Sequence, residues 1–526
     1  METNSPQPGM WQRSTTRHFL RWLFSWPTLR RILIAFACVA TLIALFYVVE
    51  DWRGKRAWLA FKNRMEARGE HFDLASIVPK PVPPEQNFAM TPLLKPLLDY
   101  TRVNGTNVWR DPEGVRRAEA VNVDTVARPG EKSPLRSGRW ATGTLTDLGA
   151  WQAFYRDNAN YPAPAQPGAA DDDVLLALSK FDAELAELRA AVARPYSVFP
   201  VHYEEGVDVL LKHLAVLRKL ALLPSLRAIA LLELGRSDAA LGDVELVLQM
   251  GEALKDEPLF IPQLVRFAIL QIALQPVWEG LAQGRWNEAQ LAALQGHLER
   301  VHPLEGYPVS LRGENTIFVG QTVDSLRTGR YFLRDLGSGG DRQSTWLERF
   351  LTRATPDGWF YQNQLVCSRL LLEQYLPAAD LQRQCIDLNV LKAGDAAVER
   401  LAARRTPYNL IASMLVPACG RVAERFAYAQ TTVDLAQVAC ALERYRLDHG
   451  QYPETLDALA PQFIAKLPHD VITCQPLKYR RTDDGRFVLY SVGWNQQDDG
   501  GKVVLGKRDG TVQTRTGDWV WQYPPK

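Results

Sequence analysis

In two short segments of this chain a histidine lies close to carboxylates, which is the arrangement that a general base uses. One group is His202-Tyr203-Glu204-Glu205, and the other is Leu467-Pro468-His469-Asp470. Neighbours in sequence rarely present both side chains to one substrate. The His-Glu-x-x-His pattern of zinc proteases, the Gly-x-Ser-x-Gly turn of serine hydrolases and the Rossmann glycine pattern are all missing from the sequence. We therefore predict no catalytic residue, and a non-enzymatic protein is favoured.

The cysteines are a second set of reactive side chains: Cys38, Cys367, Cys385, Cys419, Cys440 and Cys474. They show no Cys-x-x-Cys or Cys/His spacing of the kind that binds zinc. If one helix carries Cys419 and Cys440, they lie roughly 30 Å apart, whereas a disulfide needs about 6 Å between Cα atoms. We expect buried thiols, and the sequence leaves open whether one pair forms a disulfide.

An uncharged apolar segment, residues 32–49, precedes all of these residues except Cys38 itself. As a helix it would extend roughly 27 Å, about the thickness of the hydrocarbon core of a bilayer. Trp22, Trp26, Tyr47 and Trp52 lie near its ends, where aromatic rings prefer the membrane interface. These flanks disfavour a buried core helix, and the charged residues after Val49 disfavour a cleaved signal peptide. We predict one transmembrane helix and the lipid bilayer as a partner.

The orientation of this helix follows from the charges at its two ends, although basic residues occur on both sides. Arg30 and Arg31 directly precede the segment, whereas Glu50 and Asp51 directly follow it. Because positive residues are retained in the cytoplasm, we predict a cytoplasmic N-terminus, a cytoplasmic (inner) membrane location and a periplasmic body.

Composition limits the remaining possibilities. The chain has 526 residues, is 46% hydrophobic, and carries 61 basic and 59 acidic residues for a formal net charge of +2. This balance gives no basic field, so we predict no nucleic-acid partner. The predicted organisation is a basic tail (1–31), the transmembrane helix (32–49), a juxtamembrane segment (50–170), a helical domain (171–405) and a C-terminal domain (406–526). The juxtamembrane segment is predicted to continue the helix to Gly69, and a Pro-rich linker and an irregular part follow it.

Leucines at helical spacing dominate residues 171–405 and predict several antiparallel helices, separated at Pro224, Gly235, Pro258, Pro276 and Gly284. Residues 226–254 resemble a tetratricopeptide-type hairpin, and the turn at 281–285 repeats its Gly-Arg pair. The spacing of these turns differs from the roughly 34-residue period of that repeat, so we predict a helical bundle or solenoid-like layer. We expect an irregular insertion at 303–345, whose glycines at 337–340 do not form a phosphate-binding loop.

The last hundred residues begin with a long amphipathic helix, in which Leu435, Val438, Leu442 and Tyr445 share one face, and which ends at Gly450. A strand-like segment, 486–493, follows the turn Asp483-Asp484-Gly485. Together these features predict a helix packed on a small sheet.

This region, about residues 431–501, resembles the globular domain of the major pseudopilin of type II secretion systems. The residues that carry the resemblance are Ala441-Leu442-Glu443-Arg444-Tyr445-Arg446-Leu447-Asp448-His449-Gly450-Gln451-Tyr452-Pro453, Leu467-Pro468, Asp470, Pro476-Leu477, Tyr479, Phe487 and Tyr490-Ser491-Val492-Gly493. The family usually has Pro after the equivalent of Asp470, and Gly where Cys474 stands. Pseudopilins also begin with a short leader cut before a Phe-Thr-Leu-x-Glu-like stretch, which does not precede Ile32. The resemblance therefore implies an α+β fold for this domain rather than polymerisation into a pilus.

Some members of that family bind calcium in the loop after the Tyr-Ser-x-Gly strand. Here Asn495, Asp498 and Asp499 offer hard oxygen ligands beside Gly500 and Gly501. Calcium takes about six to eight oxygen ligands, so backbone carbonyls and water would have to complete the set. The alternative is an acidic surface turn. Calcium is the one cofactor that the sequence suggests.

These features favour a non-enzymatic, membrane-anchored protein of the bacterial envelope, whose pseudopilin-like domain contacts other envelope or secretion-system proteins. Two alternatives remain open. One is a membrane-anchored envelope hydrolase whose site is assembled from residues far apart in sequence. The other is a helical scaffold that binds peptides.

Overall fold

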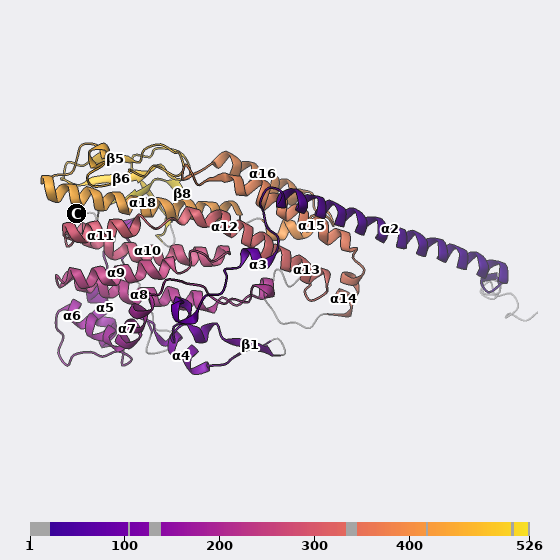
Figure 1. The fold of residues 1–526 in the computed structure, drawn as a ribbon, viewed down its shortest axis with the longest axis horizontal. Coiled ribbons are helices and arrows are strands. Elements are labelled where there is room, and N and C mark those ends of the chain that lie inside the picture. Colours follow the sequence, from indigo (N-terminus) through magenta and orange to yellow (C-terminus); the bar gives the residue numbers. More distant parts are fainter. Residues whose placement is uncertain are drawn as a thin grey trace, which may run out of the picture. The chain divides into compact units, whose positions relative to one another are not determined.

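The computed structural model describes residues 22–103, 106–125, 138–332, 345–416, 419–506 and 510–523. It is mostly helical and contains small antiparallel sheets, which confirms the α+β class (Figure 1). The chain divides into two compact units, each of which makes most of its contacts within itself. The anchor unit comprises Met1–Arg64 and Val323–Leu365, and the body comprises Met65–Thr322 and Val366–Lys526.

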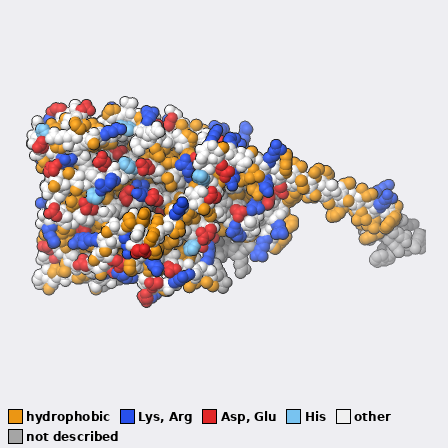
Figure 2. All heavy atoms as spheres, in the orientation of Figure 1, with side chains coloured by type: hydrophobic (Ala, Val, Ile, Leu, Met, Phe, Trp, Pro, Cys, Tyr) orange, Lys and Arg blue, Asp and Glu red, His pale blue; other side chains and the backbone are white. Residues whose placement is uncertain are grey.

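The anchor unit is built on α2 (Trp26–Glu66), one continuous helix of 41 residues that includes the predicted span. Large apolar side chains are exposed along this helix, and Figure 2 shows them in orange. The prediction that the helix continues beyond the span and stops near Gly69 is confirmed, because Gly69 adopts a left-handed φ of 89°. The unit also contains α14 (Trp346–Arg353) and the first part of α15 (Asp357–Arg369).

The first part of the body consists of short elements, as the many turn residues predict. They are α3 (Leu74–Ile77), β1 (Tyr100–Val103), β2 (Thr106–Trp109), α4 (Pro112–Ala120) and α5 (Leu148–Arg156). The two strands form an antiparallel hairpin. The Pro-rich segment between α3 and Pro84 is extended, since proline fixes φ and disfavours helix at the residue before it.

A helical layer follows, comprising α6 (Ala170–Leu178), α7 (Asp182–Ala191), α8 (Lys212–Glu233), α9 (Ser237–Glu252), α10 (Phe260–Ala282) and α11 (Glu288–Leu298). The turns after α8 and α10 have the same geometry, with Gly235 and Gly284 at left-handed φ. The N–H groups of Arg236 and Arg285 each donate to the carbonyl five residues earlier, at 2.8 Å. Each of these glycine-capped turns joins two consecutive helices, α8 to α9 and α10 to α11.

The predicted interruptions at Pro224 and Pro276 are wrong, because both prolines lie inside continuous helices, α8 and α10. Pro276 has no N–H to donate to the carbonyl of Ile272, four residues earlier in the helix. That carbonyl instead accepts a hydrogen bond from the Ser225 hydroxyl of α8, at 3.0 Å. Tertiary packing thus replaces the helical hydrogen bond that the sequence removes.

The predicted irregular insertion is also wrong over much of its length. Residues 306–327 are helical, as α12 (Gly306–Gly313), a π-helix (Glu314–Gly320) and α13 (Gln321–Arg327). Glycine lowers helix propensity, but here it allows close packing: a Cβ atom on Gly313 would lie 1.6 Å from the carbonyl oxygen of Pro258. The predicted glycine loop at 337–340 lies outside the described residues.

The C-terminal part contains α16 (Leu388–Ala403), α17 (Leu410–Leu415) and the predicted long helix, α18 (Cys419–His449). One three-stranded antiparallel sheet has the order β5 (Lys478–Arg481), β6 (Phe487–Ser491), β9 (Trp519–Trp521). This part also contains the hairpins β3 (Ala379–Asp380) with β4 (Cys385–Ile386), and β7 (Val503–Leu505) with β8 (Val512–Gly517). Leu435, Val438 and Leu442 are fully buried, and each contributes roughly 1.5–3 kcal/mol through burial. The predicted helix with a small antiparallel sheet is therefore present.

Candidate functional site

Within the anchor unit, two acidic residues at the end of the apolar segment hold α15 against α2. The Asp51 carboxylate accepts the backbone N–H of Gly358 at 2.8 Å, at the N-terminus of α15, where a negative charge is favourable. The buried Glu50 carboxylate accepts the indole N–H of Trp359 at 3.0 Å and one Arg53 N–H at 3.0 Å. The acidic pair used to predict orientation therefore also has a structural role.

Two glycines let the same helices touch backbone to backbone. A Cβ atom on Gly54 would lie 2.2 Å from the Gly358 carbonyl oxygen, and one on Gly358 would lie 2.0 Å from the Glu50 carbonyl oxygen. Real Cβ atoms do not approach this closely, so both positions need glycine. We call Glu50, Asp51, Gly54, Gly358 and Trp359 the anchor clasp. Sequence reasoning missed it, because its halves are about three hundred residues apart.

The three predicted calcium ligands lie in the loop after β6. The Asn495 amide donates to Asp499 Oδ2 at 3.2 Å. Asp498 faces other partners: its Oδ1 accepts the Tyr490 hydroxyl at 2.9 Å, and its Oδ2 lies 3.4 Å from Lys478 Nζ. The Tyr490 hydrogen bond is the largest of the effects that lower the pKa of Asp498. Calcium remains a prediction for these residues.

Asp518, which the sequence analysis did not single out, organises this loop. It is 1% exposed, and its carboxylate accepts the backbone N–H groups of Gly501 at 2.6 Å, Lys502 at 3.2 Å and Asp499 at 3.3 Å. Burial raises the pKa of Asp518, while these three donors act in the opposite direction. A buried carboxylate that accepts three backbone N–H groups fixes the conformation of the backbone that carries them.

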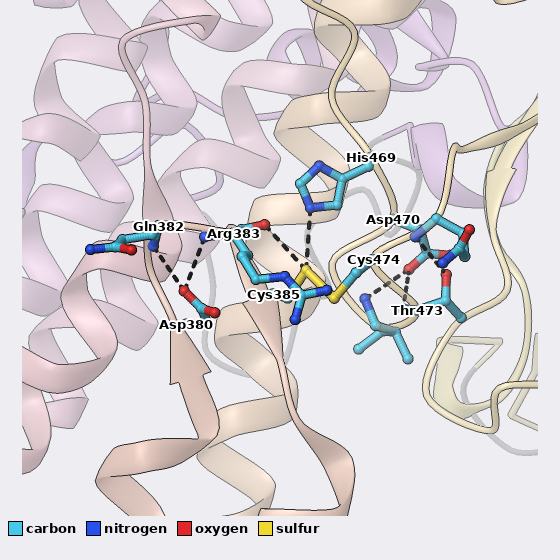
Figure 3. Close-up of a disulfide and its surroundings, with 10 residues drawn as sticks. Asp380, Gln382, Arg383, Cys385, His469, Asp470, Thr473 and Cys474 are labelled. Atoms are coloured by element: carbon cyan, nitrogen blue, oxygen red, sulfur yellow. Dashed lines mark hydrogen bonds between the residues drawn. A yellow bond between two sulfur atoms is a disulfide. The ribbon is translucent and has the colours of Figure 1, made fainter.

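The two histidine groups differ in the structure. His202 Nδ1 lies 3.0 Å from Glu204 Oε1, in an exposed position. His469 and Asp470 have separate partners, as Figure 3 shows. The His469 ring lies 3.2 Å from Cys385 Sγ, whereas buried Asp470 accepts the N–H groups of Ile472 and Val492 at 2.8 and 3.0 Å. Asp470 therefore shapes the backbone instead of activating the imidazole.

A disulfide joins Cys385 of β4 to Cys474, with 5.8 Å between the Cα atoms (Figure 3). The two cysteines are separated by 89 positions in the sequence. Cys419 and Cys440 both lie on one helix, α18, which is the condition under which a disulfide between them was predicted to be impossible. Cys367 and Cys440 are buried free thiols, and burial raises the pKa of each to about 12.

Three buried carboxyl groups of the body have a pKa raised close to neutral. Burial raises the pKa of Glu257, Glu314 and Asp434 to about 7. Each accepts a hydrogen bond from the protein. The donors are the Tyr203 hydroxyl at 2.7 Å, the Phe260 backbone N–H at 2.8 Å and the Gln430 amide at 2.9 Å, respectively. These donors lie within the packed helices, so we assign the three groups to the core.

Two helices in the described part of the chain are long and apolar enough to cross a membrane, α2 and α10. The apolar stretch of α2 is 0% buried within the protein, whereas that of α10 is 61% buried. Within the described residues, no group of three or more His, Cys, Asp or Glu side chains is arranged to hold a metal ion. Comparison with family models, curated proteins and solved structures gave no match to this chain. The architecture thus defines an α+β protein with one exposed apolar helix of membrane-spanning length.

Proposed function

We propose that this chain is a single-pass protein of a bacterial cytoplasmic membrane, with its N-terminus in the cytoplasm and its body in the periplasm. The observation that carries the proposal is the exposure of α2: Phe36 is 71% exposed and Leu42 is 65% exposed, on a stretch without charge. Leaving so many apolar side chains in water is unfavourable by about 25 cal/mol for each Å². A bilayer removes that cost.

The disulfide supports the periplasmic side for the body. Disulfides persist in oxidising compartments and are rare in the cytoplasm. Cys385 and Cys474 both belong to the body, and their Cα separation of 5.8 Å fits a disulfide.

We further propose that the C-terminal domain is pseudopilin-like and that the body contacts other envelope or secretion-system proteins. Two observations support the fold. Helix α18 packs near the antiparallel sheet β5-β6-β9, the arrangement expected of that family. Cys474 has a φ of 54°, a conformation that favours glycine, and glycine is what the family usually has there.

A topology map tests the proposal. Alkaline phosphatase fused after Lys526 is expected to be active, and a fluorescent protein at the same place is expected to be dark. A fluorescent protein fused before Met1 should fluoresce. In the same cells, Cys385 and Cys474 should resist maleimide until a reductant is added. Phosphatase inactivity with bright C-terminal fluorescence would place the body in the cytoplasm and refute the proposed orientation.

A further inference from the structure

We infer that α14 is a second membrane contact of the anchor unit. In this inference α14 lies in the headgroup region and inserts Trp346, Phe350 and Leu351 into the leaflet from which α2 emerges. It rests on the proposed function, because it requires α2 to span a bilayer.

The apolar side chains of α14 are unusually exposed for a folded protein. Trp346 is 78% exposed, Phe350 is 61% exposed and Leu351 is 55% exposed. At 3.6 residues per turn, these three positions occupy about 140° of the helix circumference, so they form one continuous apolar face. Single exposed apolar residues are common, but two aromatic rings and a leucine on one short helix mark a contact surface.

The helix is specified locally. Thr345 and Glu348 form a capping box: the Glu348 carboxylate accepts the Thr345 N–H at 2.7 Å, and the Thr345 hydroxyl oxygen accepts the Glu348 N–H at 3.3 Å. Such a cap contributes roughly 0.5–2 kcal/mol to helix stability. The apolar face of α14 therefore lies on a helix whose N-terminus is fixed by its own side chains.

The position of α14 within the anchor unit identifies the occupant of this face. The Tyr47 hydroxyl, in the last turn of the apolar segment, donates a hydrogen bond to the carbonyl of Ala354, directly after α14. Phe46 meets the Trp359 ring edge-to-face, with 6.4 Å between centroids. The first contact ties the end of α14, and the second ties the start of α15, to the level at which α2 leaves the hydrocarbon. An eight-residue helix is about 12 Å long, so the backbone of α14 stays within roughly that distance of its contact with Tyr47.

The charges of α14 fit the same environment. Arg349 and Arg353 lie beside the apolar face and not within it, at positions from which long basic side chains reach lipid phosphates while their stems cover apolar surface. Aromatic side chains flanked by arginines along one side of a short helix are typical of an interfacial helix. The continuity with the proposed span therefore favours phospholipid over a protein partner.

Site-specific photocrosslinking in the full-length protein, in its native membrane, tests the inference. The photoreactive amino acid p-benzoylphenylalanine replaces Phe350 in one variant, which keeps an aromatic ring at that position. It replaces Leu42, in the middle of the apolar segment, in a second variant. The matched control replaces Thr352, on the opposite side of α14. After irradiation, mass spectrometry of the purified protein identifies lipid adducts.

We expect phospholipid adducts at position 350 in a yield several times that at position 352. Adducts at position 42 but not at 350 would overturn the inference and leave the proposed anchor intact. A crosslink from position 350 to another protein, or to a second copy of this chain, would also overturn it. Absence of lipid adducts at position 42 would refute the proposed function itself.

Discussion

Replacing Asp518 with alanine should release the loop after β6. The carboxylate accepts three backbone N–H groups, of which the one from Gly501, at 2.6 Å, is the shortest. A hydrogen bond to a charged group is worth roughly 1.5–3 kcal/mol, and the two longer bonds are worth less than the first. Water can reach the outer part of the loop and replace some of this loss. We therefore expect local opening to become easier by about 2–4 kcal/mol.

Hydrogen exchange measures this change at the affected amides. Since 1.4 kcal/mol corresponds to a factor of about ten, the amides of Gly501 and Lys502 should exchange about thirtyfold to several hundredfold faster in Asp518→Ala. Asp518→Asn keeps one acceptor oxygen, so it should show a smaller acceleration. The matched control is Asp483→Asn, at an exposed turn of the same domain, which should leave these amides unchanged.

An unchanged exchange rate in Asp518→Ala would refute the reasoning, because it would mean that the loop does not depend on this carboxylate. Faster exchange throughout the body, including α18, would also refute the local account. In that case Asp518 would support the domain as a whole.

Three further predictions concern the anchor clasp, the loop and the core. Gly358→Val should clash with the Glu50 carbonyl, weaken the anchor clasp by about 1–3 kcal/mol and speed amide exchange at the start of α15. The control Gly242→Val, at a glycine with no neighbour within 4 Å, should leave that exchange unchanged. Equal exchange rates at the start of α15 in Gly358→Val and in the unmodified protein would contradict the close contact. Added calcium, at about millimolar concentration, should slow exchange in the loop after β6, and Asp498→Asn should remove the effect; no effect on the unmodified protein would refute calcium binding. The pKa of Glu257 is about 7 when folded and 4.5 ordinarily, so its contribution to stability is full below pH 4.5 and is lost as pH rises towards 7. Glu257→Gln should make the free energy of unfolding less dependent on pH across this window, and an unaltered slope would contradict the assignment.

The sequence was informative where local chemistry decides structure. An uncharged segment flanked by aromatic and basic residues predicted the apolar helix, and Gly69 and Gly450 marked the ends of two long helices. Leucine spacing located most helices of the body. These features act over a few residues, so periodicity and capping rules capture them.

The wrong and the missing predictions have a common physical cause, which is contact between segments that are distant in sequence. Pro276 is accommodated because a hydroxyl on another helix serves the orphaned carbonyl of Ile272. Gly313 is helical because its missing Cβ lets Pro258 approach. The anchor clasp joins residues 50–54 to residues 358–359, and Asp518 bonds to a loop about seventeen residues before it. A single sequence carries no local signal for such pairs, because tertiary packing overrides local propensity.

Length and apolar composition alone do not distinguish a membrane-spanning helix from a core helix in this chain. Both α2 and α10 are long and apolar enough to cross a membrane. However, α10 carries polar side chains that bond within the body: Gln263 donates to three backbone carbonyls, and Glu279 accepts three hydrogen bonds. In a bilayer such groups would be expensive, whereas the apolar segment of α2 contains no amide or charged side chain. Amide and charged side chains inside an apolar helix therefore indicate a protein core, and their absence from residues 32–49 is the sequence feature that best supports a membrane anchor.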